Sequence, residues 1–249
     1  MGIGARLIMN TNPFRSLSIL TTLVLLVSSG PWAAAADEEG VALAIVYDNS
    51  GSMKQPVRDE TGKMTPKYII ARRALEAVVK QLQTFAAKPA PGAPRKIEAG
   101  LFVFRGNGAR ELVKFGPFDP GAAQEWTDHL PLPSTGTPLG YALSQAGRAV
   151  LNSKLARKHV LVITDGVNTV GPDPSETMPK LKQQAGQEHA SLSVHFVAFE
   201  VDAKVFAPVK QLGATVVGAV DEKQLNTQLE FILQRKILLE DEEPPVKKK

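Results

Sequence analysis

Three polar side chains follow the first long apolar run of the chain at alternating positions. The run, residues 41–46, consists of Val, Ala, Leu and Ile, a composition typical of a strand buried on both faces. Asp48, Ser50 and Ser52 come just after it. Because alternate residues of an extended chain point to the same side, their oxygens can converge on one point. One carboxylate and two neutral hydroxyls suit a hard divalent cation, and Gly51 allows a tight bend between the serines.

Two later segments are placed to complete the same site. A second buried run, residues 160–163, is followed at once by Asp165, a second carboxylate at the carboxyl end of a strand. The loop at residues 134–140 is rich in hydroxyl side chains, includes Thr137 and leads into a helical pattern. Ligands of open α/β sheets bind outside the carboxyl ends of the strands, where connections diverge to opposite faces. We therefore expect Thr137 and Asp165 to reach the edge that carries Asp48.

Together, these three segments resemble the von Willebrand factor type A (VWA) domain and its metal-ion-dependent adhesion site (MIDAS). The family pattern D-x-S-x-S…T…D is met without substitution by Asp48, Ser50, Ser52, Thr137 and Asp165. The flanking strings SGSM, TPLG and TDG also match what the family usually carries. The resemblance extends over roughly residues 40–238.

The resemblance implies a function in recognition. Ser50 and Ser52 would bind the ion directly, whereas Thr137 and the two aspartates would bind it directly or through water. The expected ion is Mg²⁺, with Mn²⁺ or Ca²⁺ as alternatives. An acidic residue of an unknown protein partner would complete the metal shell. This chemistry breaks no bond, so the chain is predicted not to be an enzyme. Basic residues on the loops of this edge would favour an acidic partner or merely form a solvated rim: Lys54, Arg58, Arg105 and Arg110.

The elements that position these residues alternate between strands and helices, which predicts an α/β fold with right-handed crossovers. The predicted class is a doubly wound, mostly parallel six-stranded sheet with helices on both faces. Strands are expected at residues 41–46, 97–104, 111–115, 160–163, 192–199 and 214–217, the third as an antiparallel edge strand. Helices are expected at 71–85, 122–130, 138–150, after an N-cap at Ser175, at 205–212, and after a cap at Asp221. The family's strand order, 3-2-1-4-5-6, would place Asp48 beside Asp165. Residues 53–66 are predicted as a polar loop.

The two ends of the chain are predicted to lie outside the domain. Residues 1–36 have the pattern of a signal peptide: Arg6 and Arg15 precede a short apolar core, and small residues allow cleavage near Ala36. The core is too short to span about 30 Å of hydrocarbon. Residues 37–239 are expected to form the VWA domain and 240–249 a flexible charged tail. The chain has no cysteine, so an exported protein of this kind is expected to be periplasmic or secreted, without disulfides.

Other functional classes fit the sequence less well. With 29 basic and 25 acidic residues, the chain gives no indication of nucleic-acid binding. A phosphoryl-transfer enzyme of the phosphoaspartate type would use Asp48 as nucleophile, but it needs a second acid two residues later, where Ser50 stands. No P-loop string is present, and the four histidines fit surface or core positions better than a catalytic triad. The phosphoryl-transfer enzyme and a metal-indifferent scaffold remain as alternatives.

Overall fold

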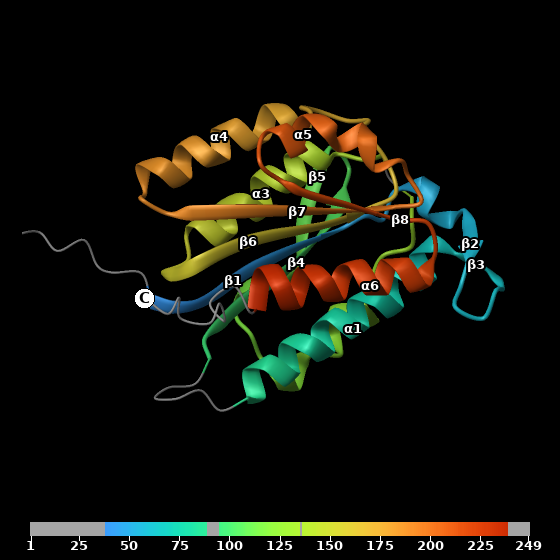
Figure 1. Cartoon of the computed structure of the whole chain (residues 1–249), viewed down its shortest axis with the longest axis horizontal. Helices are drawn as coiled ribbons and strands as arrows, with labels where there is room; N and C mark the ends of the chain where they lie inside the picture. The colour runs from blue at the N-terminus through green and yellow to red at the C-terminus, as the bar shows by residue number, and fades with distance from the viewer. Residues whose placement is uncertain (1–37, 89–94, 135, 239–249) are drawn as a thin grey trace, which may run out of the picture. The chain divides into compact units, whose positions relative to one another are not determined.

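The predicted sheet is confirmed in a computed structural model, which describes residues 38–88, 95–134 and 136–238 (Figure 1). Within these residues, a six-stranded sheet has the order β5-β4-β1-β6-β7-β8. Its strands are β1 (Glu38–Tyr47), β4 (Ile97–Arg105), β5 (Gly108–Pro117), β6 (Leu155–Thr164), β7 (Ser191–Phe199) and β8 (Thr215–Ala219). Neighbouring strands are parallel except for the pair β4–β5. In chain order this is 3-2-1-4-5-6, so β1 and β6 are central neighbours, as expected.

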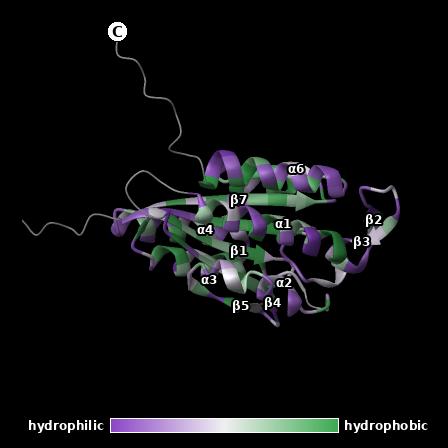
Figure 2. Ribbon diagram, turned by 90° about the horizontal axis from the view of Figure 1, so that it is seen from below, coloured by the Kyte–Doolittle hydropathy of each residue, from purple (hydrophilic) through white to green (hydrophobic). Residues whose placement is uncertain are grey.

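Helices cover both faces of the sheet (Figure 1). One face packs against α1 (Lys67–Ala87), α2 (Glu125–Asp128) and α6 (Glu222–Ile232), and the other against α3 (Leu139–Leu151), α4 (Pro174–Gln187) and α5 (Ala207–Gln211). Successive side chains of β1 alternate between these two cores, which accounts for its continuous apolar run. The strands are coloured mainly as hydrophobic in Figure 2, whereas the helices show hydrophilic segments as well. The predicted core stripe of α1 is confirmed, since Ala71, Leu75, Val78, Leu82 and Phe85 are all buried.

Two predictions about helices were wrong in detail. The helix expected over residues 122–130 is only a short 3₁₀ turn (Pro120–Ala122) followed by the single turn α2. Prolines at 131 and 133 prevent continuation of the helix, because proline donates no backbone hydrogen bond. The N-cap of α4 is Asp173, not Ser175: the Asp173 Oδ1 accepts hydrogen bonds from the Ser175 amide (2.8 Å) and hydroxyl (2.6 Å). Pro174 then occupies the first helical position, where its missing N–H costs nothing.

The segment predicted as a polar loop contains a 3₁₀ turn (Gly51–Lys54) and a small hairpin, β2 (Pro56–Arg58) and β3 (Met64–Pro66). Asp59 holds the hairpin turn: its Oδ1 accepts from the Thr61 and Lys63 amides, both at 2.9 Å, and its Oδ2 from the Thr65 hydroxyl at 2.8 Å. The Thr61 hydroxyl also donates to Oδ1 and makes the largest contribution to the pKa shift. Together these hydrogen bonds lower the pKa of Asp59 to about 2. Val57 is the only apolar side chain of the two hairpin strands that is buried in the core, so the hairpin lacks the repeating apolar pattern from which periodicity could predict it.

The predicted signal peptide (1–36) and charged tail (240–249) lie outside the described residues. Within the described part of the chain, no helix combines the length and apolarity required to cross a membrane. The final predicted helix is present as α6, capped by Asp221, whose side chain accepts from the Gln224 amide at 2.8 Å. It continues as a π-helical segment, Leu233–Leu238.

Candidate metal-ion site

The two predicted carboxylates leave neighbouring strands at the same edge of the sheet. β1 and β6 run parallel with Tyr47 opposite Ile163, and the Asp48 amide donates a hydrogen bond to the Ile163 carbonyl at 3.0 Å. Asp48 follows the end of β1, and Asp165 follows the end of β6. This edge is the right-hand end of the sheet in Figure 1, where the β2–β3 hairpin also lies. The strand order thus brings together two side chains that are 117 positions apart in the numbering.

A continuous row of oxygens joins the serines to the second aspartate. The Ser50 and Ser52 hydroxyl oxygens are 3.0 Å apart, and the Ser52 hydroxyl donates to Asp165 Oδ1 at 2.7 Å. Adjacent ligands of an octahedral ion with bonds of about 2.1 Å lie about 3.0 Å from each other. The spacing of these oxygens therefore fits the edge of a small divalent cation's coordination shell.

Thr137 comes to the same place from the loop before α3. Its amide donates to the Thr169 hydroxyl at 2.8 Å, and the Thr169 amide donates to its carbonyl at 2.9 Å. A methyl group placed on Gly166 would lie 3.8 Å from the Thr137 hydroxyl oxygen and 3.9 Å from that of Ser52. The two hydroxyls therefore flank Gly166, directly after Asp165. The structure brings all five predicted residues to one edge.

Asp48 is a fully buried carboxylate. Its Oδ1 accepts from the Ser50 amide at 2.7 Å and its Oδ2 from the Thr164 hydroxyl at 2.6 Å. Burial, followed by the nearby charge of Asp165, raises the pKa of Asp48 to about 6, although these hydrogen bonds oppose the shift. A cation bound at this edge would compensate the negative charge of Asp48. The described residues contain no group of three or more His, Cys, Asp or Glu side chains suited to a metal, so a cation here depends on the hydroxyls.

Comparison with known proteins decides the family. The family model of the von Willebrand factor type A domain matches residues 42–232. The chain belongs to the VWA family. A search of curated protein sequences gave no significant match.

Solved structures of several VWA-fold proteins are similar to this chain. A mutant of the PilB minor pilin from Streptococcus sanguinis has a TM-score of 0.57 at 15% identity, covering 78% of this chain and 61% of the pilin. The VWA domain of the type V pili tip protein Mfa5 from Porphyromonas gingivalis has a TM-score of 0.54 at 13% identity, covering 79% of this chain and 95% of that one. Proximal thread matrix protein 1 from the mussel byssus, solved with a zinc-occupied MIDAS motif, has a TM-score of 0.54 at 16% identity, with coverages of 79% and 48%. At these identities the likeness concerns the fold, and this chain spans about three fifths of the pilin's length.

Two residues beside the site of this VWA domain, Lys67 and Glu200, were not predicted from the sequence. Lys67, the first residue of α1, is buried, and its ammonium lies 3.0 Å from Asp165 Oδ2 and 3.1 Å from Glu200 Oε2. It also donates to Gln55 Oε1 at 3.4 Å. Burial alone would lower the pKa of Lys67, but the hydrogen bonds and charges of Asp165 and Glu200 raise it. A signal was available, because the helix dipole disfavours a cation at a helix N-terminus unless a local anion holds it there.

Glu200 was also missed. It follows the end of β7 with a backbone φ of 54°, an unusual conformation for a residue other than glycine. Its amide donates to the Ala219 carbonyl at 2.6 Å, which fixes this turn to the end of β8. The turn aims the Glu200 carboxylate at Lys67. Strained backbone of this kind is concentrated at functional sites.

Asn49 occupies the first x position of the D-x-S-x-S pattern, between Asp48 and Ser50. Its hydrogen bonds connect the VWA site to the neighbouring elements. Its side-chain Oδ1 accepts from the Phe104 amide at 2.8 Å, and its carbonyl accepts from the Ser134 amide at 3.1 Å. The first bond fixes the loop to β4, and the second fixes it to the loop that carries Thr137. One side-chain and one backbone acceptor of Asn49 therefore hold the motif loops together, independently of any bound ion.

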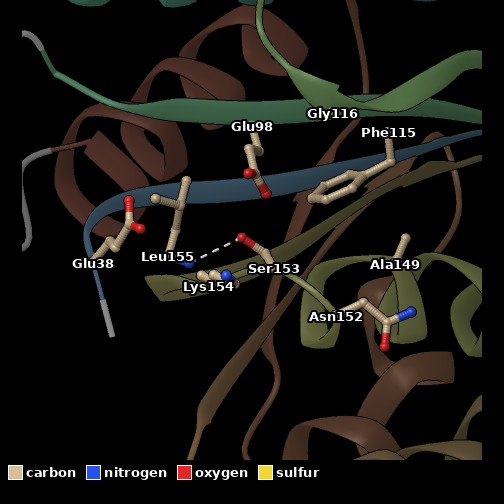
Figure 3. Close-up of a pocket in the computed structure, with 9 residues that line it drawn as sticks. All are labelled: Glu38, Glu98, Phe115, Gly116, Ala149, Asn152, Ser153, Lys154 and Leu155. Carbon is tan, nitrogen blue, oxygen red and sulfur yellow. Dashed lines mark hydrogen bonds between the residues drawn. The ribbon is translucent and has the colours of Figure 1, made fainter. Parts of the chain in front are cut away.

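A hollow of about 360 Å³ lies at the opposite, amino-terminal end of β1, between Glu38, Glu98 and Lys154 (Figure 3). The Ser153 hydroxyl in its wall accepts from the Leu155 amide at 3.0 Å (Figure 3). Glu38 forms an ion pair with Lys96. Ser153 and Glu38 are therefore bonded to other groups of the protein. The hollow is separate from the metal-ion edge.

Proposed function

We propose that this chain is an exported VWA domain that binds a protein partner through a divalent cation. The cation would be held by Asp48, Ser50, Ser52, Thr137 and Asp165, and a carboxylate of the partner would complete its shell. The observation that carries the proposal is the row of oxygens from Ser50 through Ser52 to Asp165, with separations of 3.0 and 2.7 Å, beside the buried Asp48.

The donor set supports Mg²⁺ as the ion, with Mn²⁺ or Ca²⁺ as alternatives. All five side chains offer oxygen, the donor that hard cations prefer, and the two hydroxyls closest to Asp165 are neutral. Zinc favours nitrogen and sulfur ligands, and the five residues supply neither. The mussel protein was solved with zinc in its MIDAS motif, but the all-oxygen donor set here makes Mg²⁺ the expected ion.

A shell with only two carboxylates and three neutral hydroxyls leaves the cation electrophilic, which favours an incoming anionic ligand. The loops at the same edge also expose large apolar side chains: Met64, Leu132, Val167, Val205 and Val220. Such side chains would offer a protein partner apolar contacts at this edge, which a small free anion cannot use. This combination supports a protein that presents an acidic residue over a small free anion. The exposed basic residues Lys54, Arg58, Arg105 and Arg110 would add attraction for an acidic surface.

The alternative of a phosphoaspartate enzyme is less well supported. Both side-chain oxygens of Asp48 already accept hydrogen bonds, and the side chain is fully buried. An enzyme of this class also needs a second acid two residues after the nucleophile, where this chain has Ser50. Phosphatase turnover with Mg²⁺ that disappears in Asp48→Asn would nevertheless reverse this conclusion.

The test of the proposed function is partner capture under two metal conditions. The purified wild-type domain, immobilised, is incubated with an extract of its source cells in Mg²⁺ and, separately, in EDTA. We expect one protein to be retained in Mg²⁺ and lost in EDTA, and to be lost with Asp48→Ala in either condition. Arg72→Ala, a change on the exposed face of α1, is the matched control and should retain it. A partner retained equally by Asp48→Ala in EDTA would support the metal-indifferent scaffold.

A further inference from the structure

The strongest unassigned feature of the molecule is a buried lysine that touches the candidate metal site. The Lys67 side chain is 3% exposed and lies between two carboxylates, one buried in the site and one at its rim. The Asp165 side chain is fully buried, whereas that of Glu200 is 40% exposed. Both oxygens of Asp165 are engaged, Oδ1 by the Ser52 hydroxyl and Oδ2 by Lys67. A cation that binds Asp165 must therefore share it with an ammonium group.

We propose that Lys67 is a built-in counter-ion that holds Asp165 when no metal is present and lowers the affinity of the site for a divalent ion. Glu200 is the second residue of this arrangement, because its carboxylate also lies within ion-pair distance of the ammonium, at 3.1 Å. This inference rests on the proposed function, since it assigns a role to residues beside the same metal site.

The charges at this edge determine how Lys67 would affect the binding of a cation. Two carboxylates that face each other repel, and an ion pair removes that repulsion for Asp165 without any metal. A divalent ion placed next to Asp165 is then repelled by the ammonium, and this repulsion is strong because the groups are shielded from water. Part of the interaction between Lys67 and Asp165 must weaken when the metal takes over the carboxylate. Glu200 keeps the ammonium neutralised as that happens, so the lysine need not leave its buried position.

The geometry around Glu200 supports a specific role and not a chance contact. Its backbone adopts a φ of 54°, which costs energy for a residue with a side chain, and its amide is tied to the Ala219 carbonyl. Gln55, after the serine loop, also accepts a hydrogen bond from Lys67. Three elements therefore converge on one ammonium, and each comes from a loop at the metal edge.

The test is a calorimetric titration of Mn²⁺ into the metal-free domain, with melting curves recorded in EDTA. Lys67→Met, which keeps the length and apolar stem of the side chain, should bind Mn²⁺ about tenfold more tightly than the wild type and should melt at a lower temperature without metal. Lys67→Arg, the matched control, keeps the charge. Its Mn²⁺ affinity and its melting temperature without metal should both stay closer to those of the wild type than the values for Lys67→Met do. Glu200→Gln should bind Mn²⁺ more weakly, and this effect should shrink when it is combined with Lys67→Met.

The outcomes separate the inference from the proposed function. If the wild type and Lys67→Met bind Mn²⁺ with equal affinity, or Lys67→Met binds it more weakly, Lys67 merely positions Asp165 and the inference is wrong, while the metal site stands. If Lys67→Met binds Mn²⁺ and the wild type does not, the inference about Lys67 is supported, but the proposed function fails because the wild-type domain does not bind the ion. If neither binds, both the inference and the proposed function fail. Glu200→Gln alters a partly exposed side chain, so its predicted sign can be tested even if Lys67→Met folds poorly.

Discussion

Asp48 and Asp165 follow two adjacent parallel strands, yet of these two aspartates only Asp165 has a lysine of the described residues within ion-pair distance. Asp165 is paired with Lys67 at 3.0 Å, whereas Asp48 accepts hydrogen bonds from the Ser50 amide and the Thr164 hydroxyl. The charge of Asp48 is therefore the less compensated of the two. Because its charge lacks a counter-ion in the described part of the chain, Asp48 is the residue whose electrostatic energy a bound cation should change most.

The first prediction concerns the pH dependence of Asp48 without metal. Its pKa is raised from 3.8 to about 6 in the folded state, so the fold holds the proton more tightly than the unfolded chain does. The contribution of Asp48 to stability therefore falls as the pH rises from about 4 to 6 and stays unfavourable above that. Asp48→Asn does not titrate, and its stability relative to the wild type should rise over the same window by at most about 3 kcal/mol.

Urea unfolding in EDTA at pH 4, 5, 6 and 7.5 measures this difference. We expect the two proteins to converge toward pH 4, apart from a constant offset caused by the amide's hydrogen bonding. A stability difference that does not change with pH would show that Asp48 keeps an ordinary pKa in the fold.

The second prediction concerns two buried histidines on neighbouring strands. His159 of β6 and His195 of β7 face each other, and Nδ1 of His159 lies 3.2 Å from Nε2 of His195. Burial lowers the pKa of His159 to about 3 and that of His195 to about 4. Because the unfolded chain binds protons more readily, the stability that these neutral rings contribute is present above about pH 6.5 and is lost as the pH falls toward 4.

His195→Gln should therefore reduce the loss of stability on acidification, by roughly 2–3 kcal/mol at pH 4. The measurement is urea unfolding of both proteins between pH 7.5 and 4. His189→Gln is the matched control, since His189 follows α4 in a turn outside this pair. If His195→Gln loses stability as steeply as the wild type, the histidine pair is not the source of the acid sensitivity.

The third prediction concerns the packing of the loop that carries Thr137. A methyl group on Gly140, the second residue of α3, would lie 2.0 Å from the Pro172 carbonyl oxygen in the loop after β6. Gly140→Ala should therefore push the two loops apart and destabilise the domain by about 1–3 kcal/mol, with weaker Mg²⁺ binding as well. Gly186→Ala is the control, because no atom lies within 4 Å of the added methyl, and it should stabilise α4 by about 0.5–1 kcal/mol. Thermal melting of both variants decides the point.

The fourth prediction concerns export. The charged start, short apolar core and small residues before Asp37 indicate a cleaved signal peptide. The mature protein, recovered from outside the cytoplasm, should begin near Asp37. N-terminal sequencing measures this directly, and a mature chain that still begins at Met1 would contradict the prediction.

Much of the fold and all five candidate ligands could be predicted because they depend on local patterns. Buried strands appear as apolar runs, and the ligands Asp48 and Asp165 directly follow two such strands. The pairing of Lys67 with Glu200 could not be predicted in this way, because the two residues are far apart in the chain, although a lysine at the start of a predicted helix was a signal that a local anion is nearby. The β2–β3 hairpin was also missed, because the bonds of Asp59 hold its turn and Val57 alone packs into the core, which leaves no repeating apolar pattern.

The most direct test of the account is a titration of Mg²⁺ into the metal-free wild-type domain and into Asp48→Ala, followed by melting curves. Glu76→Ala is the matched control, because it also removes a carboxylate but lies on α1 in a partly exposed pair with Arg72. We predict saturable binding to the wild type and to Glu76→Ala, with a gain of about 2.7 kcal/mol when Mg²⁺ is at about 100 times Kd. Asp48→Ala should show neither binding nor a gain in melting temperature. A wild-type melting curve that millimolar Mg²⁺ leaves unchanged, or an equal gain in Asp48→Ala, would contradict the account.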